Sequence, residues 1–211
     1  MMKKLLIAGL AALMLPVAAL AQNAPATAPA PTVNIRGVVV SLAGNVLTVG
    51  APMGPATTTV TLAPNYKVQY IVATTLAAIT PGSYVGSAAL PGPNGTLRAI
   101  EVHVFPPGVT GRLFSSPFDL GPTSTMTNGN VQKIGTTKVD NVSANTITVQ
   151  IDNGEKTLVV TPDTPIVTYA PADASAIVKG AHVNVRATKN PDGSLTAAGV
   201  NVGKDGLVPP M

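Results

Sequence analysis

The chain contains no cysteine and no tryptophan, and aromatic residues make up only 3% of its 211 residues. Without cysteine no disulfide can form, so stability must come from apolar burial and backbone hydrogen bonds. The scarcity of aromatic side chains also removes the stacking surfaces with which proteins bind single-stranded nucleic acid. These absences exclude a disulfide-stapled scaffold and argue against a nucleic-acid-binding protein.

Charge is scarce as well. Charged residues are 10% of the chain, and 13 basic residues face 9 acidic ones. If Lys3 and Lys4 belong to a cleaved leader, 11 basic residues remain and the net charge is about +2. Lysine and arginine do not cluster anywhere. This balance is too small to indicate a nucleic-acid partner or an anionic membrane surface.

The first residues, MMKKLLIAGLAALMLPVAALAQ, place two lysines before a short apolar run and end in a small-x-small site. This order is typical of a secretory signal peptide over residues 1–21, and predicts a periplasmic or secreted protein. The alternative is an uncleaved membrane anchor. No second apolar window of about 20 residues follows, so we expect no membrane span after cleavage. Residues 22–32 are rich in Ala and Pro and predict an extended linker or a disordered terminus.

The remaining sequence repeats itself. Gly37 recurs as Gly135, and PNGTL at 93–97 recurs as PDGSL at 191–195, each 98 positions later. Between them NVLTV at 45–49 and NTITV at 145–149 are 100 positions apart, so the spacing changes only where loops are expected. Such a pattern indicates duplication of a folded unit rather than low complexity.

Each copy has alternating apolar residues in short runs separated by turn residues, which is typical of β-strands. The turns PNG and PDG predict hairpins, and a change of phase predicts a bulge or bend near Ala99 and Ala197. A short helical segment is expected between the third and fourth strands, at 74–80 and 173–178. Five strands with a helix in this place is the order of an OB-type barrel. A flattened β-sandwich is the alternative.

The predicted fold class is therefore all-β, with two tandem five-stranded OB-like barrels. The predicted segments are a signal peptide at 1–21, a linker at 22–32, a first barrel at 33–105, a connector at 106–130, a second barrel at 131–205 and a tail at 206–211.

The connector belongs to neither copy, yet it carries two of the three phenylalanines, Phe114 and Phe118, together with Arg112 and Asp119. A disordered tether seldom contains scarce aromatic residues. We expect an ordered strap with both phenylalanines buried between the modules. Alternatively these four residues form a docking surface for a partner, or the connector is a flexible linker.

GNVLTV at 44–49, PGSYVG at 81–86 and PNGTLRA at 93–99 resemble a bacterial domain of unknown function, found in exported proteins as single or tandem OB-like β-barrel modules. The resemblance covers 33–105 and 131–203. The central PFDLGPTSTMTNG and the terminal VGKDGLVPPM are similar to those of a narrower group of short exported bacterial proteins, some labelled as transporter permeases. A permease needs several membrane spans, so this activity is not expected here. The resemblance implies no catalytic residue and no cofactor.

Few residues indicate chemistry. Glu101 and His103 lie two apart on a strand face that we expect to be exposed, where they form half of a metal site or an ordinary solvated face. His182, Asn184 and Arg186 form either an anion-binding patch or an ordinary outer sheet face. There is no G-x-S-x-G, S-x-x-K or phosphate-binding loop, so an enzyme is not expected.

The sequence thus predicts an exported, non-enzymatic binding or scaffolding protein whose partner is another envelope protein or a glycan. The alternative is a periplasmic metal-binding accessory protein that uses Glu101, His103, His182 and Asp163. A hydrolase of cell-wall polymers is disfavoured because no pair of acidic residues stands out as general acid and base.

Overall fold

The computed structural model describes residues 30–210, so the predicted signal peptide and most of the predicted linker lie outside the described residues. Within this range thirteen strands form one continuous hydrogen-bonded sheet. The chain is all-β, as predicted. The strands are β1 (Thr32–Ala43), β2 (Val46–Gly50), β3 (Thr57–Ala73), β4 (Tyr84–Pro91), β5 (Leu97–Ala99), β6 (Val102–Val104), β7 (Phe114–Pro117), β8 (Thr125–Val139), β9 (Val142–Ile151), β10 (Gly154–Val160), β11 (Ile166–Ala172), β12 (His182–Lys189) and β13 (Leu195–Gly203).

The helical content is limited to single turns. The helices predicted at 74–80 and 173–178 are 3-10 turns of three residues each, η1 (Leu76–Ala78) and η3 (Ala174–Ala176). Asp173 caps η3 by accepting a 2.8 Å hydrogen bond from the backbone N–H of Ser175. Two further turns are η2 (Pro93–Gly95) and η4 (Lys204–Gly206). No helix within residues 30–210 has the length and apolar character needed to cross a membrane.

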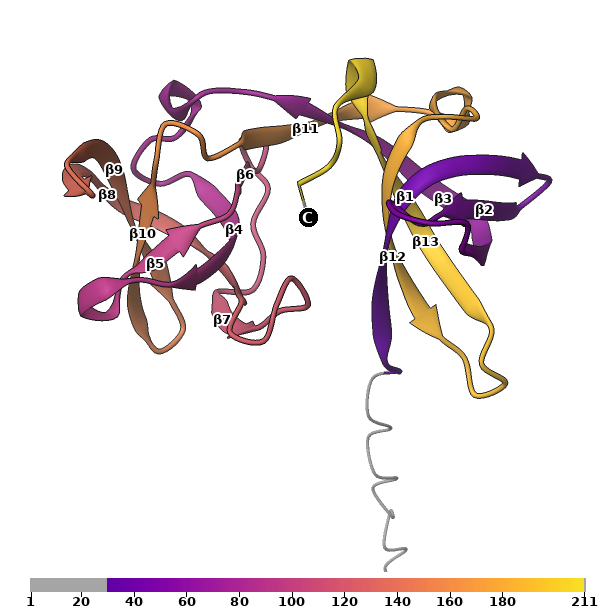
Figure 1. Cartoon of the computed structure of the whole chain (residues 1–211), viewed down its shortest axis with the longest axis horizontal. Helices are drawn as coiled ribbons and strands as arrows, with labels where there is room; N and C mark the ends of the chain where they lie inside the picture. The colour runs from indigo at the N-terminus through magenta and orange to yellow at the C-terminus, as the bar shows by residue number, and fades with distance from the viewer. Residues whose placement is uncertain (1–29, 211) are drawn as a thin grey trace, which may run out of the picture.

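Five strands close the first barrel: β1, β2, β3, β12 and β13. β1 pairs with β2 and β12, β2 pairs with β3, and β12 pairs with β13, all antiparallel. The ring is closed by a parallel pairing of β13 with β3, in which Thr196 lies opposite Thr61. Figure 1 shows this barrel on the right, with strands from both ends of the colour scale side by side.

The second barrel repeats the same order of pairings with β8, β9, β10, β5 and β4. β8 pairs with β9 and β4, β9 pairs with β10, and β4 pairs with β5, again antiparallel. A parallel pairing of β10 with β5, in which Val159 lies opposite Arg98, completes the ring. β6 adds to β4, and the connector strand β7 adds to the outer edge of β8.

This pairing corrects the predicted domain organisation. The sequence predicted one barrel from 33–105 and another from 131–205, each continuous in the chain. Instead the first barrel takes its last two strands from the C-terminal end of the chain, while β4 and β5 complete the second barrel. The two predicted copies exchange their final hairpins. The physical reason is that β3 continues for 17 residues, through a kink at Asn65, where φ is 60°, instead of turning back; this carries the following hairpin into the other barrel.

Each hydrophobic core is correspondingly shared between the copies. In the first barrel, Leu47, Val60 and Leu62 from the N-terminal strands pack in one cluster with Val185 and Val200 from the C-terminal ones. The second core likewise combines residues of both copies, with Val85, Val102 and Val104 beside Ile147, Val149 and Leu158. Neither copy alone contains all the strands that bury its apolar face in this arrangement.

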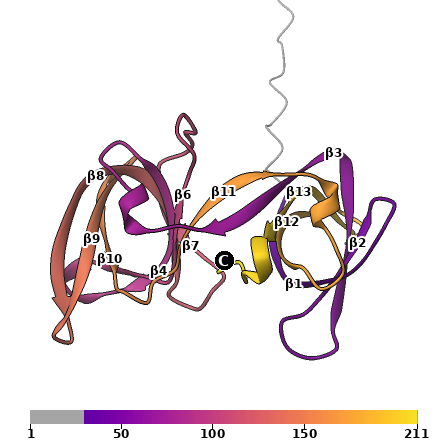
Figure 2. The same cartoon turned by 90° about the horizontal axis from the view of Figure 1, so that it is seen from above.

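The two chain crossings lie together as an antiparallel ribbon made from β11 and the second half of β3, which Figure 2 shows passing from one barrel to the other. Ile71 lies opposite Tyr169 in this ribbon. These residues are 98 positions apart, which is the spacing of the two predicted copies. Equivalent residues of the two copies therefore face each other where the copies cross, so the two copies are related by symmetry about this point.

The predicted bends are confirmed. The backbone N–H groups of Ile100 and Glu101 both point to the carbonyl oxygen of Ala88, at 2.7 and 3.4 Å, so two residues oppose one between β5 and β6. In the second copy Thr196 lies opposite Thr188 and Asn201 lies opposite Asn184, so β13 has one residue more than β12 across this stretch. Such bulges bend a strand sharply enough to close a small barrel.

The exchange can be tested with engineered disulfides, because the chain has no other cysteine. Paired strands lie about 4.8 Å apart, which is within disulfide range. Thr61→Cys with Thr196→Cys joins residues that face each other across the exchanged pairing. We expect this pair to oxidise completely, seen as a loss of two hydrogen atoms by mass spectrometry and faster migration on a non-reducing gel.

The matched control is Val159→Cys with Thr196→Cys. Val159 is 98 positions after Thr61, so it would face Thr196 if each copy closed its own barrel. We expect no bond in this variant within a monomer. A bond in the control and none in the first pair would show continuous barrels instead of exchanged hairpins.

Candidate functional site

The connector is an ordered strap, as its composition indicated. β7 runs antiparallel to β8, and the Ser115 and Thr127 hydroxyls are hydrogen-bonded at 2.8 Å. Just before β7, the Arg112 carbonyl accepts a 2.8 Å hydrogen bond from the Tyr84 hydroxyl. After it, the Ser124 hydroxyl donates to the Phe118 carbonyl at 2.8 Å and closes the turn. The backbone of the connector is therefore held on both sides of β7.

The two phenylalanines are half-buried instead of enclosed between the modules. Each lies beside a guanidinium group: that of Arg112 is 5.5 Å from the Phe114 ring centroid, and that of Arg36 is 5.6 Å from the Phe118 centroid. Such cation–π contacts orient an arginine without neutralising it. The connector thus places aromatic rings and cations together at the surface.

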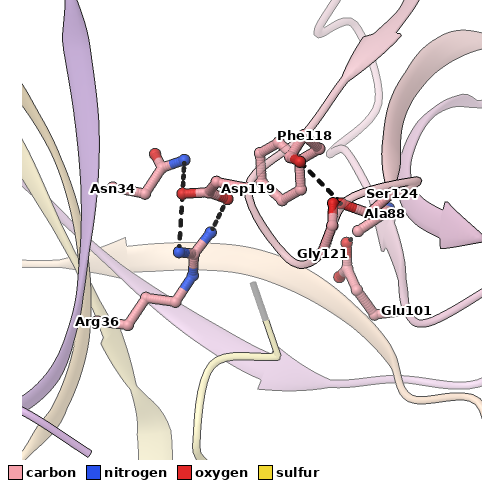
Figure 3. Close-up of polar contacts among 8 residues, drawn as sticks. All are labelled: Asn34, Arg36, Ala88, Glu101, Phe118, Asp119, Gly121 and Ser124. Carbon is pink, nitrogen blue, oxygen red and sulfur yellow. Dashed lines mark hydrogen bonds and ion pairs between the residues drawn. The ribbon is translucent and has the colours of Figure 1, made fainter.

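Asp119 joins the connector to the first barrel (Figure 3). Arg36 of β1 donates two hydrogen bonds to its carboxylate, at 2.7 and 3.0 Å, and Asn34 donates a third at 3.1 Å. The hydrogen bond from Arg36 is the main reason that the pKa of Asp119 is lowered, and the Asn34 contact and the positive charge of Arg36 act in the same direction. We call these three residues the clasp. It connects the turn after β7 to β1, which is distant in the chain.

Two adjoining grooves lie along β7, and together we call them the interbarrel cleft. The first, of about 640 Å³, lies between β7 and the outer face of β1 and β12. The second, of about 760 Å³, lies on the other side of β7 and reaches β10. Phe114, Ser116, Pro117 and Arg186 line both grooves. All four predicted partner-binding residues line the cleft. Arg112, Phe114 and Phe118 do so from the connector, and Asp119 does so as part of the clasp.

The cleft also contains residues that the sequence reasoning missed. Lys156 on β10 lines the second groove beside Arg112, and Asn34 on β1 lines the first. Arg186 lies opposite Asn34 across the β1–β12 pairing. Alternation marks Asn34 and Arg36 as outward-facing, but only the strand exchange brings this outer face against the connector.

The predicted patch of His182, Asn184 and Arg186 is divided by the structure. Arg186 is exposed and reaches the cleft, whereas His182 is half-buried and only 9% of Asn184 is exposed. The prediction that all three face water is therefore wrong for Asn184. Asn184 lies opposite Arg36 of the clasp, so the face that it occupies is covered.

Glu101 and His103 are not on an exposed face, which corrects the sequence prediction. Both side chains are buried, and a Glu101 oxygen lies 2.6 Å from the His103 Nδ1. The other oxygen accepts a 3.3 Å hydrogen bond from the Ala88 N–H at the bulge. Their outer face is covered because β11 pairs with β6 there. His103 Nε2 is buried without a hydrogen-bond partner.

Aromatic rings cover this pair. Tyr169 stacks on His103 at 5.0 Å between ring centroids, and Phe105 lies between Tyr169 and Tyr84, at 5.3 and 4.9 Å. Burial raises the pKa of Tyr169, and the charge of Glu101 adds to the effect. The cluster forms a packed connection from the ribbon to Tyr84, whose hydroxyl holds the Arg112 carbonyl.

The residues of the metal-binding hypothesis do not come together. Glu101 and His103 are buried beside β11, Asp163 is exposed between β10 and β11, and His182 lies in the first barrel. Among residues 30–210 there is no group of three or more His, Cys, Asp or Glu side chains that could hold a metal ion.

Asp119→Asn tests the clasp. A bidentate ion pair that is partly exposed contributes about 0.5–1 kcal/mol, so we expect the free energy of unfolding to fall by about this amount at pH 7. The pKa of Asp119 is lowered in the folded state, so its contribution is complete well above 3.8 and is lost as the pH falls through the folded-state value. Urea unfolding between pH 2 and pH 7 should show the two proteins converging in acid.

Asp163→Asn is the matched control, because Asp163 is exposed and has no ion-pair partner among the described residues. It should leave the free energy of unfolding unchanged at every pH. A difference between wild type and Asp119→Asn that persists at pH 2 would argue against the ion pair as its cause.

His103→Leu tests the buried pair. It leaves the Glu101 carboxylate buried without its partner, so we expect a loss of about 3 kcal/mol or more in the free energy of unfolding. Adding Glu101→Gln removes the charge but keeps an acceptor for the Ala88 N–H, and should recover a large part of that loss. Urea unfolding of the two single variants and the double variant measures the coupling. Strictly additive losses would mean that the two side chains do not stabilise each other.

Comparison with known proteins bears on the C-terminal part of the chain. Residues 137–200 match the family model of Domain of unknown function (DUF5666). No curated protein and no solved structure matches the chain. The matched segment begins in β8 and ends in β13, so its strands contribute to both barrels. The chain thus contains a DUF5666 domain over residues 137–200, within the second of the two predicted copies.

Proposed function

We propose that the chain is an exported, non-enzymatic binding or scaffolding protein of the bacterial envelope, which holds another envelope protein or a glycan in the interbarrel cleft. The observation that carries this proposal is that the connector, present once in the chain, places Arg112, Phe114 and Phe118 along a cleft between two barrels. Export is supported by the N-terminal sequence, with its lysines, apolar run and small-x-small site.

The barrels are proposed to be a tandem pair of OB type with exchanged hairpins. In each ring the first strand pairs with the second and fourth, and the third pairs in parallel with the fifth. This Greek-key order is that of an OB-type barrel, a fold that commonly binds extended polymers. Fold alone does not define a ligand, so the proposal depends on the cleft.

The cleft has the character of a preformed binding surface. The β3–β11 ribbon joins the barrels along six residue pairs, and the clasp joins them again at Asp119. A cleft held at two places loses little conformational freedom when a partner binds, which favours affinity. Its walls offer guanidinium groups, phenyl rings, hydroxyls and amides, which are groups that bind and orient.

Site-specific photocrosslinking tests the proposal. Ser116 is exposed and lines both grooves, so a benzoylphenylalanine at this position should capture whatever occupies the cleft. In cells that produce the full chain, irradiation is expected to give a discrete species of higher mass in the envelope fraction.

The control position is Met53, which is 89% exposed in the loop between β2 and β3, outside the cleft. It should give only background capture. The same species from both positions, or none from Ser116, would contradict a partner in the cleft.

A further inference from the structure

We infer that the interbarrel cleft binds an anionic polysaccharide, with Arg112, Lys156 and Arg186 holding its acidic groups. This inference rests on the proposed function and specifies its ligand. The three cations come from the connector, the second barrel and the first barrel respectively, and all three line the second groove. The binding site is therefore complete only when the two barrels and the connector come together.

The charges in the cleft are unbalanced. Asp119 is already paired with Arg36, which leaves Asp152 as the carboxylate that lines the second groove beside the three cations. The described residues provide no ion-pair partner for Arg112, Lys156 or Arg186. Arg112 and Arg186 are exposed, and Lys156 is half-buried. Cations on both sides of an open groove favour a ligand with repeated negative charges.

The groups between the cations suit a sugar chain. Phe114 and Pro117 give an apolar surface on which the carbon face of a sugar ring can pack, and Ser116 and Asn153 offer hydrogen-bonding groups. The Phe114 ring is held from one side by the Arg112 guanidinium, 5.5 Å from its centroid. Ligand sites typically combine such an apolar surface with a few placed polar groups.

A globular protein fits this surface less well. Stable protein interfaces have a desolvated apolar core surrounded by a polar rim. The large exposed hydrophobic residues are scattered over the described chain, and among them only Val33 lines the cleft. Two grooves that adjoin along a four-residue strand instead suit a narrow polymer.

The probe for the test is polygalacturonate, compared with its methyl ester, which has the same backbone without the charges. We expect the purified protein to bind polygalacturonate by isothermal titration calorimetry and to bind the ester much more weakly. Raising the salt concentration should weaken the first interaction, because partly exposed ion pairs are screened. Lys156→Gln with Arg186→Gln should weaken binding by about tenfold or more.

Lys179→Gln is the matched control, because Lys179 is exposed and lies on neither groove. It removes one positive charge and should leave affinity unchanged within about twofold. Single variants at Arg186 and Lys156 allow a like-for-like comparison, and urea unfolding checks that each variant folds. If Lys179→Gln lowered the affinity for polygalacturonate as much as Arg186→Gln, the effect would come from the overall charge of the protein. That result would overturn the inference.

Absence of binding to polygalacturonate, or equal binding of the ester, would also overturn it. These outcomes are separate from failure of the proposed function. If Ser116 captures a protein in the envelope while polygalacturonate does not bind, the cleft is a binding surface but its ligand is not an anionic polysaccharide. If the Ser116 position captures nothing and polygalacturonate does not bind, both proposals fall.

Discussion

The arrangement of this protein depends on one run of hydrogen bonds, the antiparallel pairing of β11 with the second half of β3. β3 continues past the first barrel, and β11 follows β10 out of the second barrel after a short turn, so the hairpin that follows each of them enters the opposite barrel. The parallel pairings of β13 with β3 and of β10 with β5 then close both rings. The barrels are consequently joined by the crossing strands, and each of their two separate cores contains residues of both copies. The cleft between them is a product of the same crossing, since it has walls only where the barrels face each other.

Much of the local structure could be predicted from the sequence. Alternating apolar residues located the strands, and the change of phase at Ala99 and Ala197 located the bulges. The exchange of hairpins could not be predicted, because it leaves every local pattern unchanged. Thr61 faces Thr196 in the exchanged ring, and its equivalent one copy later, Val159, faces Arg98. A hairpin buries the same face and uses the same register whether it closes its own barrel or the other one, so similar copies carry no signal that separates the two arrangements.

The candidate site was predictable only in part for a related reason. Scarce phenylalanines drew attention to the connector, and its residues do line the cleft. Their partners, Arg36 and Asn34, lie about 85 residues away on β1 and meet Asp119 only through the exchange. Glu101 and His103 were wrongly expected to face water. Alternation separates the inside of a barrel from its outside, but it does not report that a second element covers the outside, as β11 does here.

The covered pair shows where the two predicted copies have diverged. The positions equivalent to Glu101 and His103, 98 residues later, are Gly199 and Asn201, so only one copy has the buried acid and base. The connector is likewise present once. Both differences lie outside the two barrel cores: the pair is buried against β11 of the ribbon, and the connector lines the cleft.

These two differences are also physically linked. His103 stacks on Tyr169 of the ribbon, Phe105 joins Tyr169 to Tyr84, and the Tyr84 hydroxyl holds the backbone of Arg112. A buried acid–imidazole pair is a costly way to stabilise a small barrel, because apolar side chains of similar size would serve as well or better. The pair instead belongs to a series of packed side chains that runs from the ribbon to Arg112 of the cleft. It fixes the rings that position the connector, so the stability lost in burying the pair serves the geometry of the cleft.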